Sequence, residues 1–289
     1  MSRKALALFI LVGLAWGIPY FFIRVALNDF QPATIAFVRV TVGALILLPI
    51  AAKQGTLRSA LKQWPWILAF AVIEMAGPWI MLPTSEQHVS SGLAGLLVAT
   101  VPFVATPLTY LMGDKSVFHP KAIAGLVIGF AGIIALVGID ALSGHVEPFW
   151  VGVLLLVAVC YAVAPVIADR KLNAESSVAV IGLAMAMVSI IYVVPVSTQL
   201  PAEIAAGPAW QSWAALAVLG VVCSALAFVM FFRLIGLIGV ARSSLIVYVN
   251  MAVALALGIV FLKEPITTGF VIGVPMVIVG LLLAGRKRS

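Results

Sequence analysis

The sequence predicts an all-α membrane protein in which ten transmembrane helices form two inverted five-helix repeats. Three observations point to this fold class. The composition is 64% hydrophobic and only 9% charged, whereas charged residues make up about a quarter of ordinary soluble domains. Long apolar runs recur along the chain, and its two halves resemble each other. We therefore expect the chain to lie in a lipid bilayer.

The apolar runs are about 18 to 25 residues long, enough to cross a hydrocarbon core of about 30 Å at about 1.5 Å per residue. The predicted helices cover ten stretches of the chain, namely 5–27, 33–52, 65–83, 88–112, 119–139, 149–168, 177–197, 211–232, 239–262 and 267–285. The first run follows the basic start MSRK. It is too long for a signal peptide and has no small-residue cleavage site, so we expect it to remain as a helix.

Local signals support individual runs. Pro49 ends the second run and Pro195 ends the seventh, because proline removes a backbone donor. Tryptophans typical of the lipid interface mark the starts of the third, sixth and eighth runs, namely Trp64, Trp66, Trp150, Trp210 and Trp213. The fifth and tenth runs contain Gly-x-x-x-Gly patterns, namely Gly125 to Gly129 and Gly269 to Gly273. Such glycines let helices approach closely, within the chain in the first interpretation and in a homodimer in the second.

The basic residues indicate the orientation, because short loops rich in lysine and arginine stay in the cytoplasm. Of the 17 lysines and arginines, 14 fall on one side of the predicted membrane. They are Arg3, Lys4, Lys53, Arg58, Lys62, Lys115, Lys121, Arg170, Lys171, Arg233, Arg242, Arg286, Lys287 and Arg288. The net charge of +7 is therefore a topology signal and not the sign of a nucleic-acid partner. Both termini are expected in the cytoplasm.

The sequence lacks the motifs that are typical of several other classes of function. Most predicted loops are short, which leaves no room for a soluble catalytic domain. The sequence has no Gly-x-x-x-x-Gly-Lys-Ser/Thr motif for ATP, and it offers no set of nucleophile, base and orienting group for an intramembrane enzyme. His88, His119 and His145 lie near the ends of predicted helices on alternating sides, so they do not form a metal set. We expect no enzymatic activity, cofactor or metal.

The second half of the chain repeats the first. HVSSGLAGLLVATVPFVATPLTYLMGDK in the fourth run aligns with GVARSSLIVYVNMAVALALGIVFLKEP in the ninth, and AWGIPYFFIR in the first run aligns with CYAVAPVIADR in the sixth. Five helices per half is an odd number, so the second copy must enter the membrane upside down. The predicted repeats are residues 1–140 and 146–289, which together form one transport domain.

These stretches, with ATIAFVRVTVGALILLP in the second run, resemble the ten-helix EamA type of the drug/metabolite transporter superfamily nearly end to end. The resemblance implies a carrier of small metabolites in the inner (plasma) membrane, with a central cavity between the repeats. This sequence departs from the family pattern at Met251, where a proline is usual, and keeps Pro102 in the fourth run.

Glu74 and Arg39 are the charged candidates for a site. Glu74 lies about 12 Å inside the third run, near the midplane, where a charge costs about 3 kcal/mol. It should face a wet cavity as a substrate or proton site, be a protonated hydrogen-bonding group, or pair with Arg39. Arg39 lies about 9 Å deep, where it could snorkel, pack between helices, or hold Glu74 or a substrate carboxylate. Together the two charges would suit a zwitterion such as an amino acid.

Other candidate site residues follow from helix interruptions and aromatic side chains. Helix breaks are expected at prolines inside runs that line the cavity of the resembled family, namely Pro19, Pro78, Pro102, Pro107 and Pro165. Aromatic side chains could form the cavity wall, namely Trp16, Tyr20, Trp79, Tyr161, Phe228 and Tyr248. Polar contacts could come from Ser90, Ser91, Ser243, Ser244 and Asn250. Trp16 lies too deep in its helix for an interfacial tryptophan.

The sequence therefore predicts a secondary active transporter that exposes a midplane site alternately to the two sides of the membrane. Export of amino acids or related small metabolites is the leading hypothesis. Drug efflux and metabolite uptake are the alternatives within transport, and a membrane scaffold subunit is the alternative outside it.

Overall fold

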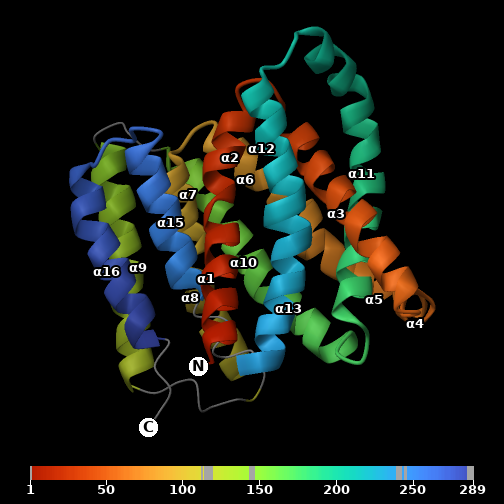
Figure 1. The fold of residues 1–289 in the computed structure, drawn as a ribbon. Coiled ribbons are helices and arrows are strands. Elements are labelled where there is room, and N and C mark those ends of the chain that lie inside the picture. Colours follow the sequence, from red (N-terminus) through yellow and green to blue (C-terminus); the bar gives the residue numbers. More distant parts are fainter. Residues whose placement is uncertain are drawn as a thin grey trace.

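The computed structural model describes residues 2–111, 113, 120–142, 147–238, 243 and 246–284. Within these ranges the chain consists of α-helices and two π-helical turns, and it contains no β-strand. Figure 1 shows the helices side by side in one bundle. The all-α prediction is confirmed for the described part of the chain.

The helices of the first half follow the predicted apolar runs. In chain order they are α1 (Arg3–Gly17), α2 (Pro19–Ala26), α3 (Pro32–Lys53), α4 (Leu57–Lys62), α5 (Trp64–Ala71), the π-helical turn η1 (Val72–Ala76), α6 (Pro78–Glu86), α7 (Ser91–Val98), α8 (Val101–Leu111) and α9 (Pro120–Leu142). The second half contains α10 (Pro148–Lys171), α11 (Ser177–Ala205), α12 (Trp210–Gly220), the π-helical turn η3 (Val221–Leu226), α13 (Ala227–Ile238), α15 (Ile246–Val260) and α16 (Thr268–Ala284).

Seven helical segments among the described residues are long and apolar enough to cross a membrane. They are Arg3–Ala26, Pro32–Lys53, Trp64–Glu86, Ser91–Leu108, Pro148–Lys171, Ser177–Ala205 and Trp210–Ile238. Shorter apolar helices cover Pro120–Leu136, Ile246–Val260 and Thr268–Gly280. The count of ten crossings and the inversion of the second half remain predictions.

Neither proline ends its helix. Pro49 lies inside α3, whose end at Lys53 is one residue beyond the predicted span 33–52. Pro195 lies inside α11, which continues to Ala205, eight residues beyond the predicted span 177–197. A proline inside a helix removes a single hydrogen bond, and neighbouring residues can still hold the helical conformation. Composition marks where a run stops being apolar, and α11 extends beyond that point.

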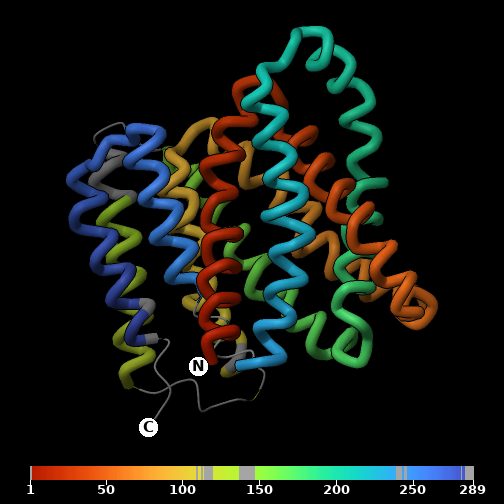
Figure 2. The backbone as a smooth tube through the Cα atoms, viewed as in Figure 1, coloured from red at the N-terminus to blue at the C-terminus, as the bar shows by residue number. Residues whose placement is uncertain are grey.

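The helices pack in two long pairs with a central group between them. The α16 helix packs along α9, and α11 packs along α3; Figures 1 and 2 place these pairs at opposite edges of the bundle. Between them, α1 packs on α13 and α15, while α10 packs on α6 and α8. Figure 1 also shows that α1 begins and α16 ends at the same end of the bundle. We call this the proximal end and the opposite one the distal end.

Glycines form the contact between α9 and α16. A Cβ added to Gly280 would lie 2.5 Å from the Cα of Gly129, and one added to Gly273 would lie 2.7 Å from the carbonyl oxygen of Gly132. Only glycine leaves enough room for backbones this close. The glycine patterns of these two helices therefore serve packing within the chain, which was the first interpretation of their sequence.

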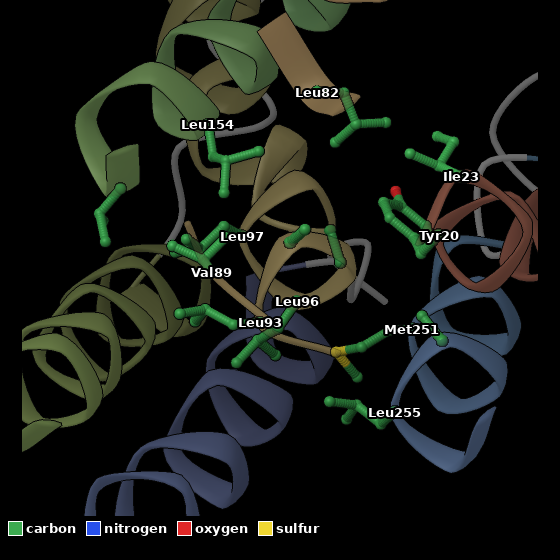
Figure 3. Close-up of a cluster of buried hydrophobic side chains, with 14 of the residues drawn as sticks. Tyr20, Ile23, Leu82, Val89, Leu93, Leu96, Leu97, Leu154, Met251 and Leu255 are labelled. Atoms are coloured by element: carbon green, nitrogen blue, oxygen red, sulfur yellow. The ribbon is translucent and has the colours of Figure 1, made fainter. Parts of the chain in front are cut away.

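Most buried apolar side chains belong to two large clusters. One joins α2, α6, α7 and α15, and Figure 3 shows part of it, with Tyr20, Leu82, Leu96 and Met251 converging from these four helices. The other joins α3, α5, η1 and α11 with part of η3. The candidate charged residues lie next to the second cluster.

Candidate functional site

Glu74 lies in the π-helical turn η1, near the middle of the span Trp64–Glu86. The amide of Gly77 donates to the carbonyl oxygen of Val72 at 3.0 Å, a bond that reaches five residues back instead of four. The ring nitrogen of Pro78 has no hydrogen to donate to the carbonyl of Glu74. These two features widen the helix at Glu74, and such turns are frequent at functional sites.

The carboxylate of Glu74 is only partly satisfied. Its side chain is half-buried, and its Oε2 atom is buried without a hydrogen-bond partner among the described residues. Cys160 and Tyr161 of α10 lie close enough to interact with its charge. A buried polar atom without a partner costs about 1–3 kcal/mol. A proton or a ligand that bonded this oxygen would recover that cost.

Arg39 is buried inside the bundle, with 6% of its surface exposed. Its guanidinium carbon lies 4.0 Å from the centroid of the Trp79 ring, which is a cation–π contact. Its Nε atom also donates to the hydroxyl of Ser224 in η3 at 3.4 Å. Arg39 therefore joins a helix of the first half to the π-helical turn of the second half, and it does not snorkel.

No ion pair joins Glu74 to Arg39. Within the described part of the chain, the guanidinium of Arg39 contacts Ser224 and Trp79, and Glu74 has an unpaired oxygen. The ion-pair interpretation of Glu74 is therefore not supported. Both side chains nevertheless border the same hydrophobic cluster, to which Trp79 belongs.

Four of the predicted aromatic residues meet at this cluster. Trp79 and Phe228 are buried in it, and Trp16 and Tyr161 pack against it. The Trp16 ring lies 5.4 Å from the ring of Phe228 and 4.7 Å from that of Phe231. Trp79 contacts Arg39, and Tyr161 lies close enough to Glu74 and Arg39 to interact with their charges. Trp16 and Phe228 belong to the same cluster, and we call these six residues the central site.

The other predicted contact residues belong to other clusters. Tyr20 is buried in the cluster of Figure 3 but lies close enough to Arg39 and Tyr161 to interact with their charges. Tyr248 packs against the same cluster. With its amide placed so that both bonds form, Asn250 Nδ2 donates to the carbonyl oxygens of Gly13 at 2.8 Å and Ile246 at 3.0 Å. This amide therefore holds α15 against α1. Ser243 is buried, and Ser244 lies outside the described residues.

The prolines differ in their effect on the helices. The α1 helix ends at Gly17 and α2 begins at Pro19, and Pro78 begins α6 directly after η1. Pro102 stands in the first turn of α8, beyond the end of α7. The break expected at Pro165 is not found, because α10 runs through it to Lys171. Pro107 likewise lies inside α8.

A polar cluster at the distal end was not predicted. Glu86, the last residue of α6, has no exposed surface. Ser91 Oγ donates to Glu86 Oε2 at 3.2 Å, and a guanidinium nitrogen of Arg24 donates to the Glu86 carbonyl oxygen. Glu264 accepts the amides of Ser91 at 2.6 Å and Gly92 at 2.9 Å. Glu86 lies between the predicted spans 65–83 and 88–112, four residues before Ser90, which caps the amino end of α7. This capping serine is the sequence signal nearest to the cluster.

Comparison with known proteins places these features in a family. The model of the EamA-like transporter family matches residues 3–138 and again residues 148–286. A relative named "Probable terminal-alkyne amino-acid exporter" from Streptantibioticus cattleyicolor is 26% identical over 285 residues, which cover 98% of this chain and 94% of that protein. "Uncharacterized transporter YvbV" from Bacillus subtilis is 23% identical over 290 residues, covering 100% and 93%.

Two further matches agree with this placement. "Uncharacterized inner membrane transporter YedA" from Escherichia coli K12 is 27% identical over 246 residues, covering 84% of this chain and 78% of that protein. A crystal structure with 18% sequence identity superposes with a TM-score of 0.68 over 98% of this chain and 97% of its own. It shows a shared fold. The relatives are named as transporters and not as enzymes, and this multi-pass membrane chain belongs to the EamA-like transporter family.

Proposed function

We propose that this chain is a secondary active transporter that exports amino acids or related small metabolites across the inner membrane by alternating access. Membership of the EamA-like transporter family supports the general class. The name of the Streptantibioticus relative supports an amino-acid-like substrate and export, and the name of the Escherichia coli relative supports the inner membrane. The central site carries the proposal, because it combines an unpaired carboxylate oxygen, a buried guanidinium and aromatic walls.

The proposed architecture is two inverted five-helix repeats, residues 1–140 and 146–289, with ten crossings. Three observations support it. The family model matches the chain twice, in two segments of similar length. Glu74 in the third span and Ser224 in the eighth, which are equivalent spans of the two five-helix halves, both lie in π-helical turns. The packing is also equivalent in the two halves. The first span, α1, packs on α13 and α15, which are the eighth and ninth spans of the proposed count. The sixth span, α10, packs on α6 and α8, which are the third and fourth.

The chemistry of the central site suits a zwitterion. The carboxylate of Glu74 would bind an ammonium group or a proton. Arg39 would hold a substrate carboxylate by charge-assisted hydrogen bonds, since its hydrogen bond to Ser224 is long at 3.4 Å. The aromatic rings of Trp16, Trp79 and Tyr161 would cover the apolar part of the substrate.

Alternating access gives the Glu74 carboxylate its role. When the site is open to one side, the carboxylate binds a cation or a proton, and it releases this group on the other side. The widened turn η1 beside it provides a place where the helix can change conformation at low cost.

Counterflow tests the substrate class. The purified chain is reconstituted in proteoliposomes preloaded with one unlabelled compound, and uptake of its labelled form is followed across a panel of amino acids, other metabolites and amphipathic drugs. We expect counterflow with at least one amino acid or close relative. Counterflow restricted to drugs would favour drug efflux, and the lack of counterflow with every compound would favour a scaffold subunit.

Glu74→Gln tests the carboxylate, because it removes the charge and keeps the shape. We expect this variant to remain folded and to lose transport driven by a pH gradient. Glu175→Gln is the matched control, since Glu175 is an acidic residue near the surface that accepts a hydrogen bond from Ser59. The control should transport at the original rate. If Glu74→Gln keeps the original rate and pH dependence, Glu74 is a structural hydrogen-bonding group.

A further inference from the structure

Glu86 and Glu264 come from distant parts of the sequence and meet at one residue. Ser91 donates its hydroxyl to Glu86 Oε2 at 3.2 Å and its amide to Glu264 Oε1 at 2.6 Å. Glu86 ends α6, whereas Glu264 follows α15. Ser91, the first residue of α7, therefore ties together an element of each half of the chain at the distal end.

The backbone around Glu264 is shaped to admit its carboxylate. A Cβ on Gly92 would lie 2.9 Å from Glu264 Oε2, and one on Gly258 would lie 2.3 Å from it. Lys263, the residue before Glu264, has a φ of 54°, a conformation that residues other than glycine rarely adopt. The two glycines and this strained residue place the carboxylate on the amino end of α7, where a negative charge is stabilised.

The carboxyl group of Glu86 lacks one hydrogen-bond partner in the same arrangement. Its side chain has no exposed surface, and its Oε1 atom has no hydrogen-bond partner among the described residues. An ionised Glu86 would therefore be a buried charge beside the carboxylate of Glu264. Two such carboxylates repel each other, and a proton on one of them removes the repulsion.

We propose that Glu86, Ser91 and Glu264 form a proton-binding latch that holds the distal end of the bundle closed. With a proton on a Glu86 oxygen, Ser91 can bond both side chains and the loop after α15 stays on α7. When this proton leaves to solvent, Glu86 becomes a carboxylate, its repulsion from Glu264 increases, and the amides of Ser91 and Gly92 separate from Glu264. The ligand of this site is a proton taken from the distal side.

Other ionisable groups also face Glu86. They are Tyr20 and Arg24 on α2, Arg39 on α3 and Glu264. Arg24 is exposed, and its guanidinium bonds the backbone carbonyl of Glu86. Arg39 contacts Trp79 and Ser224 in the central site. Neither guanidinium pairs with the Glu86 carboxylate in the structure, so a proton remains the simplest way to neutralise it.

This inference rests on the proposed function, because closing one end of the bundle matters for a carrier that alternates between its two sides. The latch can nevertheless be tested without substrate. Hydrogen exchange of the purified chain in lipid nanodiscs reports on the amides of Ser91 and Gly92 directly. Exchange is measured from pH 5 to pH 9, and each rate is compared with the intrinsic rate of an unprotected amide at the same pH. The resulting protection factors are therefore free of the intrinsic pH dependence of exchange. A chain that failed to transport any compound could still show the latch, and the reverse also holds.

We expect protection of these two amides to fall with rising pH in the unmodified chain, by on the order of tenfold. Glu86→Gln keeps the hydrogen bond from Ser91 without the charge, so its protection should stay high at every pH. Glu203→Gln is the matched control, because Glu203 also accepts a backbone amide, that of Gln31 at 2.8 Å, and also has a buried oxygen without a partner. It should behave like the unmodified chain.

A second variant keeps the test decisive if Glu86→Gln does not fold. Glu264→Gln removes the other charge, so we expect lower protection of Ser91 and Gly92 and no further fall with rising pH. The proposal is overturned if protection in the unmodified chain does not change with pH. It is also overturned if a folded Glu86→Gln or Glu264→Gln chain keeps the original pH dependence.

Discussion

Trp16 shows what a single side chain contributes to the central site. It is half-buried, and its ring packs against Phe228 and Phe231 while the rest of it borders the cluster that holds Trp79. A lipid-interface role would not place it among these rings. We interpret it as a wall that contacts the substrate, and this assignment remains a prediction.

Trp16→Ala tests that wall. We expect transport to fall about tenfold, the scale of one lost aromatic contact, while expression and folding are largely kept. Trp213→Ala is the matched control, because Trp213 packs against Phe30 at 4.9 Å and lies outside the central site. Initial rates and size-exclusion profiles of both variants provide the measurement. If Trp16→Ala loses the folded protein, Trp16 is a packing residue.

The sequence predicted how deep the candidate residues lie in their helices better than it predicted which side chains they contact. Counting residues from the helix start placed Glu74 near the middle of its span, where the structure has it. The contacts of Arg39 with Ser224 and Trp79 could not be foreseen, because they join residues from different helices. Glu86 was missed because hydropathy assigns an acidic residue at the end of an apolar run to the loop.

At the scale of single helices, the main feature of the structure is a widened helical turn in two of the spans. The π-helical turns η1 and η3 interrupt the third and eighth spans, which are equivalent spans of the two proposed repeats. Pro78 explains the first turn, and the hydroxyl of Tyr192 donates to the freed backbone at Ala76. No proline stands in or next to η3 in the sequence, so composition gives no signal for it. At this second turn the hydroxyl of Ser224 donates to the carbonyl oxygen of Leu219, five residues back, at 2.8 Å.

The α9–α16 contact yields a prediction for an element. Gly280→Ala would place a methyl group 2.5 Å from the Cα of Gly129, so the helices must separate. We expect a loss of about 1–3 kcal/mol, as for other overpacked sites, measured as a lower midpoint of thermal unfolding in detergent. Gly236→Ala is the control, because a Cβ there meets nothing within 4 Å. An unchanged midpoint for Gly280→Ala would mean that the two helices are not in close contact.

At the scale of the whole molecule, the sequence predicted the class of fold and the order of helices, and the structure added how they pack. Periodic apolar runs are a local property, so they were visible in the sequence. The pairing of α3 with α11 and of α9 with α16 depends on contacts between residues far apart in the chain. The glycine patterns of α9 and α16 predicted close packing within the chain, but they did not indicate the partner helix.

The topology of the whole chain is the last prediction. Because 14 of 17 basic residues fall on one predicted side, we expect that side to be cytoplasmic. In the structure α1 begins and α16 ends at the proximal end, whereas α11 ends at the distal end (Figure 1). A reporter that is active only in the cytoplasm should therefore be active when it is fused at Ser289 or inserted beside Lys115, and inactive beside Ala206. A reporter that is active only outside the cytoplasm should give the opposite result at each position. A cytoplasmic reading beside Lys115 together with an external reading at Ser289 would require an odd number of crossings between them and would exclude the two inverted five-helix repeats.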